Sequence, residues 1–128
     1  MELDEKEQDR SYLYGRLLAV AEAVEQCTYR DGDGREPNAR RLQPAYVQRP
    51  AAVWQTLEQQ LLPYFAQLSA GSKRYYQNLI DEIFSRFRDS DLKDRNNPLG
   101  EMYLFGYHLQ RKALRSHRSE KSENQEEK

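Results

Sequence analysis

Few side chains in this 128-residue sequence are of the types that perform catalysis or bind metals, and their spacing favours neither role. The two histidines, His108 and His117, are nine residues apart, whereas two imidazoles on one face of a helix need a spacing of four. Cys27 is the single cysteine and falls on the apolar stripe of a predicted helix, where its default role is that of a small buried hydrophobe. Because no Cys-x-x-Cys or His-x-x-x-His motif occurs, we predict no metal and no other cofactor.

The carboxylates do not form a recognisable catalytic or calcium-binding set either. Asp31 and Asp33 begin a run that resembles a calcium loop, but Glu36 stands at the sixth position, which requires glycine. Asp81 and Glu82 are adjacent, so they diverge by about 100° around a helix, which favours a solvated surface over an acid–base pair. No glycine-rich nucleotide-binding motif is present. The sequence therefore predicts a protein that is not an enzyme.

The distribution of charge along the chain is more informative about binding partners than the net charge of −1. Residues 1–9 hold five acids and one lysine, and residues 119–128 hold four acids and two lysines, whereas residues 10–118 hold 17 bases and 12 acids. Fourteen of the twenty bases are arginine, whose planar guanidinium suits phosphate. A solvated arginine-rich surface would give the same composition, so phosphate binding is one of two interpretations.

Basic residues are densest in connecting segments and near helix ends, where binding residues concentrate. Tyrosines are interleaved with them at 29–30, 46–49, 73–76 and 107–112, and a tyrosine can stack on an unpaired base. Tyrosines at helix margins can equally complete a core with their hydroxyls in water. The candidate nucleic-acid contacts are Arg30, Arg40, Arg41, Arg49, Lys73, Arg74, Arg111, Lys112 and Arg115.

Helical periodicity predicts the elements that carry these bases. Long helices are expected from about residue 10 to 28, from Pro50 to about Leu68, from about Ser72 to Arg88 and from Pro98 to Leu114, with a short helix or turn within 38–49. No alternating strand pattern or hairpin signal occurs. We therefore predict an all-α, compact bundle of four long helices plus one short helix or turn. Residues 1–9 form an acidic extension, 10–114 the bundle, and 115–128 a disordered polar tail.

Several local features sharpen these expectations. Pro63 should kink or break its helix, Ser72 should cap the next one, and Asn97 should cap the last one with Pro98 at its first position. Gly106 lies within the apolar face of that last helix. Because glycine in mid-helix costs roughly 1 kcal/mol relative to alanine, we expect a neighbouring helix to approach closely there.

Nothing in the sequence predicts contact with a membrane. The longest aliphatic run, 17–21, is far too short to span a bilayer. The acidic start does not resemble a signal peptide. A single cysteine fits a reducing cytoplasm, where we expect the protein to act.

Three stretches carry motifs that occur in the same order in a known family: Arg10–Glu22, Tyr46–Trp54 and Tyr103–Arg111. The motifs are Tyr-Leu-x-Gly-Arg-Leu, Pro-Ala-Ala-Val followed by an aromatic residue, and Gly-Tyr-x-x-Gln-Arg. Together they resemble the C-terminal region of the large subunit of type I-C CRISPR Cascade complexes, over about residues 10–114. The domains that precede this region in the large subunit are absent from the sequence.

The resemblance implies a free-standing small subunit, which this family makes by internal translation initiation, although an excised part of the large subunit would look the same. The implied partners are the backbone and large subunits, the guide RNA and the target DNA including the non-target strand, with more than one copy per complex. Since the guide reads the sequence, such a subunit needs only to hold backbone and shape. Charge reversal of Arg40 and Arg41 should then weaken R-loop formation without unfolding the bundle.

Two other functions are compatible with the same residues. A helical protein–protein adaptor would direct its basic surface to an acidic partner subunit and make no direct contact with nucleic acid. A helix-turn-helix regulator would use the turn at 69–72 and show preference for a duplex sequence.

Overall fold

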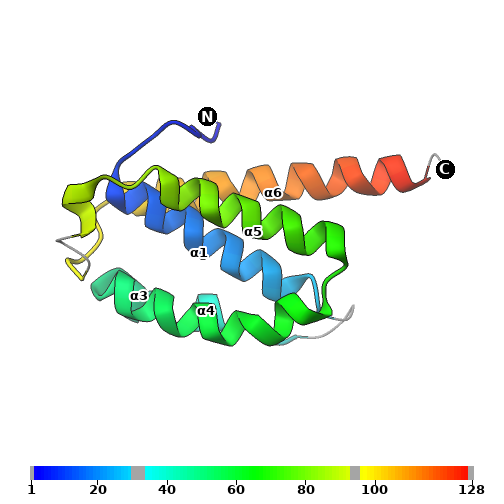
Figure 1. Ribbon diagram of the computed structural model, residues 1–128, viewed down its shortest axis with the longest axis horizontal. Helices are drawn as coiled ribbons and strands as arrows, with labels where there is room; N and C mark the ends of the chain where they lie inside the picture. The colour runs from blue at the N-terminus through cyan, green and yellow to red at the C-terminus, as the bar shows by residue number, and fades with distance from the viewer. Residues whose placement is uncertain (1, 30–33, 93–95, 127–128) are drawn as a thin grey trace.

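The computed structural model describes residues 2–29, 34–92 and 96–126, and side chains as far as His117 (Figure 1). Within these residues the chain forms helices and no strand, which confirms the predicted all-α bundle. The elements in order are α1 (Arg10–Gln26), α2 (Asn38–Arg41), α3 (Gln43–Gln48), α4 (Pro50–Gln67), α5 (Ala70–Ser85), the 3-10 turn η1 (Asp89–Leu92) and α6 (Met102–Glu126).

Helix α1 is the centre of the bundle rather than one of its walls. Every residue from Tyr12 to Glu25 is buried, and α4, α5 and α6 all pack against this helix (Figure 1). A helix that is enclosed on all sides is expected to be apolar all round. Helix α1 departs from this rule at Arg16, Glu22 and Glu25, which are buried and charged. Buried charged groups require hydrogen-bond or ion-pair partners. The partners of these residues position much of the basic surface that is described in the next subsection.

The closest contact in the fold is the crossing of α1 and α6 at two glycines. A Cβ atom on Gly106 would overlap the backbone carbonyl of Tyr12, and a Cβ atom on Gly15 would overlap the carbonyl of Tyr103. The expectation that Gly106 permits close helix approach is confirmed. The glycine opposite it, Gly15, has the same role and was not predicted.

Helix α4 runs through Pro63 without the break that the sequence led us to expect. Proline at this position leaves the carbonyl of Gln59 without its helical donor. Both residues lie on the exposed face of α4, so water can satisfy this carbonyl. Of the kink or break predicted at Pro63, the break is therefore wrong, because the carbonyl that lacks its donor faces solvent and the helix continues to Gln67.

The start of α5 lies two residues before the predicted one. The Ser69 hydroxyl accepts a hydrogen bond from the Ser72 backbone nitrogen at 3.2 Å, so Ser69 is the N-cap and Ser72 lies inside the first turn. The two serines are equally good capping residues three positions apart. Because α4 already ends at Gln67, Ser69 is the first of the two serines that can cap α5.

Helix α6 begins at Met102, so Asn97 and Pro98 are not its cap and first residue. The segment before it is held by tertiary bonds instead. The Leu99 nitrogen donates to the Val47 carbonyl at 2.8 Å, and the Gly100 nitrogen donates to Ser11 Oγ at 2.8 Å. At its other end α6 continues to Glu126, beyond the predicted end at Leu114.

Candidate nucleic-acid interface

The basic residues predicted to contact nucleic acid are spread over three helices and the junction between α3 and α4. Arg40 and Arg41 lie on α2, Lys73 and Arg74 in the first turn of α5, and the three later bases on α6. Arg49 directly precedes α4, and Arg30 lies outside the described residues. Within the described part of the chain, the exposed members of the set are Arg40, Arg41, Arg49, Lys73, Arg74, Lys112 and Arg115.

Two of these arginines converge on a carboxylate inside the bundle. Glu22 of α1 is 1% exposed, and its Oε1 lies 2.5 Å from Arg40 Nη2 and 3.8 Å from Arg111 Nη2. Its Oε2 accepts a hydrogen bond from the Tyr107 hydroxyl. A buried carboxylate needs such counter-charges to offset its loss of hydration. The hydrogen bond to Glu22 in turn raises the pKa of Arg40, so this guanidinium is firmly cationic.

Tyr107 completes this arrangement from α6. Burial, followed by its hydrogen bond to Glu22, raises the pKa of Tyr107 to about 12, so the phenol stays a donor at neutral pH. The Arg111 guanidinium lies over the Tyr107 ring, 5.3 Å from its centroid, in a cation–π contact. Glu22, Arg40, Tyr107 and Arg111 therefore form one connected group, which we call the Glu22 cluster.

The Glu22 cluster revises the expectation for charge reversal at Arg40. A glutamate at position 40 would place a second carboxylate beside the buried Glu22 and remove its closest counter-charge. Breaking a buried ion pair typically costs about 3–5 kcal/mol, and the lower value suits Arg40, whose side chain is 42% exposed. Reversal at Arg40 is therefore expected to destabilise the fold, so it cannot report on nucleic-acid contact by itself.

A second buried carboxylate fixes the start of α2. Glu25 Oε2 accepts hydrogen bonds from the Asn38 nitrogen at 2.6 Å and from the Tyr29 hydroxyl at 3.1 Å. Pro37 at the cap position provides no side-chain cap, so Glu25 takes that role from α1. Together, Glu22 and Glu25 hold the basic α2 segment against the bundle.

Sequence reasoning missed both carboxylates because it assigned α1 a single apolar face. Glu22 and Glu25 fall outside the stripe that Leu17, Val20 and Val24 define, where an amphipathic helix would expose them to water. The available signal was the breadth of the apolar residues around the helix, since Leu18 and Ala21 widen the stripe well beyond one face.

Lys73 and Arg74 lie at the end of the bundle where α1 finishes and α5 begins (Figure 1). Two contacts of the neighbouring tyrosines fix this end. Tyr76 places its hydroxyl 3.3 Å from Cys27 Sγ, and the Tyr75 ring stacks on His117 of α6 with centroids 4.0 Å apart. These contacts bring the first turn of α5 next to the part of α6 that follows Arg115.

Arg49 lies at the opposite end of the molecule from Lys73 and Arg74. Figure 1 shows that α4, which starts directly after Arg49, begins at the end of the bundle opposite to the start of α5. The start of α4 is hydrogen-bonded to the segment that precedes α6: the Ala52 nitrogen donates to Asn96 Oδ1 at 3.1 Å. The structure therefore does not bring Arg49 together with the other candidates.

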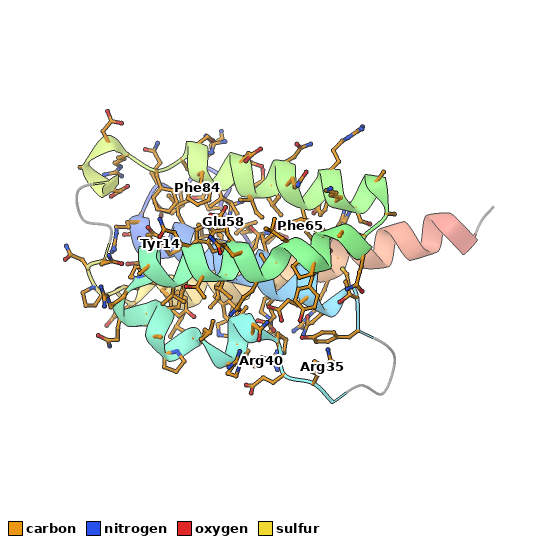
Figure 2. All side chains as sticks on the ribbon, turned by 60° about the horizontal axis from the view of Figure 1, so that its bottom comes forward. Tyr14, Arg35, Arg40, Glu58, Phe65 and Phe84 are labelled. Atoms are coloured by element: carbon orange, nitrogen blue, oxygen red, sulfur yellow. The ribbon has the colours of Figure 1, made fainter. Side chains whose placement is uncertain are left out.

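Most of the candidate bases are not neutralised by neighbouring carboxylates. Arg41 donates to Asn38 Oδ1 at 2.7 Å rather than to a carboxylate. Within the described part of the chain, no ion pair forms at Arg41, Arg49, Lys73, Arg74 or Arg115. Figure 2 shows Arg40 at the same edge of the view as Arg35, an exposed base that the predicted set did not include. An exposed positive surface thus persists although Arg40 and Arg111 are paired.

The tyrosines favour the core over base stacking. Tyr46, Tyr76 and Tyr107 are 0%, 3% and 4% exposed, so none of their rings can receive an unpaired base. Tyr29 is half-buried, with its hydroxyl on Glu25, and the half-buried Tyr75 ring is covered by His117. The interpretation that tyrosines stack on unpaired bases is therefore wrong for the three buried rings. Contact with phosphate is the remaining way in which this surface could bind nucleic acid.

A groove lined by both apolar and polar side chains lies between α4 and α5. Leu62 is 66% exposed and Phe84 40%, and the groove between the two helices is lined by Leu61, Phe65 and Ile80 with Glu58 and Asp81 at its margins (Figure 2). Such a surface suits contact with protein. Among the described residues, no group of three or more His, Cys, Asp or Glu side chains is placed to hold a metal, and no helix has the length and hydropathy of a membrane span.

Comparison with known proteins yields one family. The model of that family, described as CRISPR-associated protein (Cas_Csd1), matches residues 1–115. The match includes the acidic segment 1–9, which the three motif-bearing stretches leave out, and ends at Arg115 on α6. No curated protein matches the chain.

Proposed function

Because the chain belongs to the CRISPR-associated protein (Cas_Csd1) family, we propose that it is the non-catalytic small subunit of a type I-C Cascade complex in the cytoplasm. It helps hold the guide RNA–target DNA duplex and the displaced non-target strand while the R-loop forms. The observation that carries this proposal is a set of exposed bases on α2, α5 and α6 that form no ion pair within the described part of the chain: Arg41, Lys73, Arg74 and Arg115.

The mechanism is electrostatic capture of the sugar-phosphate backbone. Each phosphate that a base neutralises on a single strand releases condensed counterions and contributes about −0.7 to the slope of log affinity against log salt. The isolated chain binds weakly because few bases are engaged at once. Several copies held along one strand by the complex raise the effective concentration of each basic surface and so strengthen the grip.

The direct test reverses charge at two exposed bases that form no ion pair with any residue the structure describes. The variant Lys73→Glu/Arg74→Glu is expected to lower R-loop yield in a reconstituted complex, measured by gel shift on a target duplex. The matched control is Arg49→Glu/Arg88→Glu, which makes the same charge change at two exposed residues at the other end of the bundle. Equal R-loop yields for wild type and the Lys73/Arg74 variant would count against nucleic-acid contact at this end.

The α4–α5 groove supports an alternative function as a protein–protein adaptor that makes no contact with nucleic acid. In that case Leu62→Glu would prevent incorporation of the subunit into the complex, measured by size-exclusion chromatography. The Lys73→Glu/Arg74→Glu variant would then assemble normally and open target DNA as well as wild type. The two functions therefore differ in which variant impairs strand opening.

A further inference from the structure

We infer that Glu22 is a positioning residue of the basic surface, which holds Arg40 of α2 and Arg111 of α6 together so that both can contact one phosphate. This inference rests on the proposed function and adds a residue that is itself negative and buried. Glu22 does not touch nucleic acid. It acts through the two arginines.

The first support is the distance between the two guanidinium groups. Arg40 Nη2 and Arg111 Nη2 lie 2.5 Å and 3.8 Å from the same carboxylate oxygen, so the two nitrogens are at most 6.3 Å apart. Two cations this close repel each other, and they are carried by different helices. The Glu22 charge between them offsets the repulsion and makes the arrangement stable.

The second support is that both arginines keep donors for a ligand. A guanidinium has five N–H donors, and the Glu22 contacts involve one nitrogen, Nη2, of each arginine. The side chains of Arg40 and Arg111 remain 42% and 27% exposed. Each arginine therefore faces the buried carboxylate on one side and solvent on the other, where a phosphate can approach.

The third support is that the surrounding contacts restrict the side chains before any ligand arrives. Arg111 is held over the Tyr107 ring, and the Tyr107 hydroxyl binds Glu22. The backbone at Arg40 is fixed because Glu25 binds the start of α2 at the Asn38 nitrogen. An arginine that is already oriented loses less conformational entropy on binding phosphate than a free one.

A positioning role for Glu22 and simple electrostatic attraction predict opposite effects of Glu22→Gln on binding to nucleic acid. Glu22→Gln raises the net charge by one, so simple attraction would strengthen binding to a polyanion. If Glu22 positions the arginines, the same variant weakens binding despite its gain in positive charge. Glu22→Asp provides a second variant, since it keeps the charge but withdraws the carboxylate from both arginines by one methylene.

The experiment measures fluorescence anisotropy of a labelled 20-nucleotide oligothymidine with the full chain over a series of salt concentrations. R-loop yield in the reconstituted complex is measured in parallel. We expect Glu22→Gln and Glu22→Asp to weaken binding roughly three- to tenfold, and Glu22→Gln to reduce the salt slope by about 0.7, the value for one phosphate. The Arg40→Gln/Arg111→Gln variant leaves the buried Glu22 without its counter-charges and is destabilised, so affinities are compared at a temperature at which circular dichroism shows every variant to be folded. On this background, Glu22→Gln should not change strand affinity further, because the groups it positions are gone.

The Ile83→Val variant controls for loss of stability. It removes one buried methyl group near the end of α5, away from the Glu22 cluster, so it should lower the thermal midpoint and leave strand affinity within about twofold of wild type. Wild-type or tighter binding by Glu22→Gln, with weaker binding by Arg40→Gln/Arg111→Gln, would overturn the inference and leave the proposed function intact. Wild-type binding by Arg40→Gln/Arg111→Gln also overturns it, and the Lys73/Arg74 variant then decides the proposed function separately.

Discussion

Glu22 and Glu25 are carboxylates buried one turn apart on the central helix, and each holds a different part of α2. Glu22 faces two arginines, whereas Glu25 faces a backbone nitrogen and a phenol. This difference in partners has an electrostatic consequence. Glu22 is compensated by full positive charges in contact with it, while Glu25 is compensated mainly by hydrogen bonds, with a weaker attraction to Arg41.

Glu25 should therefore make stability depend on pH. Burial raises its pKa above the ordinary value of 4.5, and the hydrogen bond from Asn38 only partly opposes this shift. Because the folded state then holds the proton more tightly than the unfolded state, the Glu25 contribution to stability is present below pH 4.5 and is lost as pH rises through the folded pKa. Glu25→Gln removes this dependence.

Urea unfolding at about pH 4.5 and about pH 7 measures this effect. The free energy of unfolding of wild type, minus that of Glu25→Gln, should be smaller at the higher pH. Glu36→Gln, at an exposed carboxylate outside the bundle core, is the matched control. A wild-type-minus-Glu25→Gln difference that stays constant between the two pH values would show that the burial of Glu25 does not perturb its titration.

At the scale of the elements, two of the three motifs that suggested the family, the first and the third, lie in one seam between α1 and α6. Gly15 meets α6 beside Tyr103, and Gly106 meets α1 at Tyr12. One residue along from Gly15, Arg16 donates from Nε to Gln110 Oε1 at 2.8 Å inside the seam. The first and third motif-bearing stretches thus pack directly against each other.

The seam gives a prediction about Gly106. Gly106→Ala should destabilise the fold by about 2–3 kcal/mol, because its Cβ would meet the Tyr12 backbone, which cannot rotate away as a side chain can. The gain in helix propensity of about 1 kcal/mol is already included in this value. Urea denaturation measures the change in the free energy of unfolding.

Gly71→Ala is the control for this prediction. Gly71 lies in the first turn of α5, and a Cβ there would have no neighbour within 4 Å. This variant should leave stability unchanged or raise it by up to about 1 kcal/mol. Equal effects of alanine at positions 71 and 106 would mean that the α1–α6 crossing is not a close contact in solution.

The periodicity of the apolar residues predicted which long helices form. It did not predict where the helices begin and end, or which residues they contact. The steps of three and four in Leu13, Leu17 and Val20 predict α1 correctly, because helical spacing is a property of the local sequence. The start of α6 was misplaced because Leu99 and Gly100 bond to distant residues, which no local rule contains. The Glu22 cluster was missed for the same reason, since its members are brought together only by tertiary packing.

At the scale of the whole molecule, the positive surface coexists with an acidic segment that lies against α6. Glu2, Leu3 and Glu5 line a groove opposite Leu109 and Lys112, and the Asp4 nitrogen donates to the Tyr12 hydroxyl at 2.9 Å. This places negative charge beside one of the candidate bases. The segment therefore reduces the potential that α6 presents to a polyanion.

Neutralising this segment should strengthen binding to single strands. We expect Glu2→Gln/Glu5→Gln to raise affinity for a labelled oligothymidine about twofold or more at low salt, with the gain vanishing as the Debye length falls to about 3 Å near 1 M salt. The control Glu58→Gln/Asp81→Asn makes the same charge change at the α4–α5 groove. It should have a smaller effect, because Glu58 lies on α4, which carries none of the candidate bases, and Asp81 is about 10 Å along α5 from Arg74. Since both variants have the same net charge, a larger gain for the first would locate the strand on α6. Equal gains would instead mean that the strand responds to net charge alone, and that the basic surface has no preferred face.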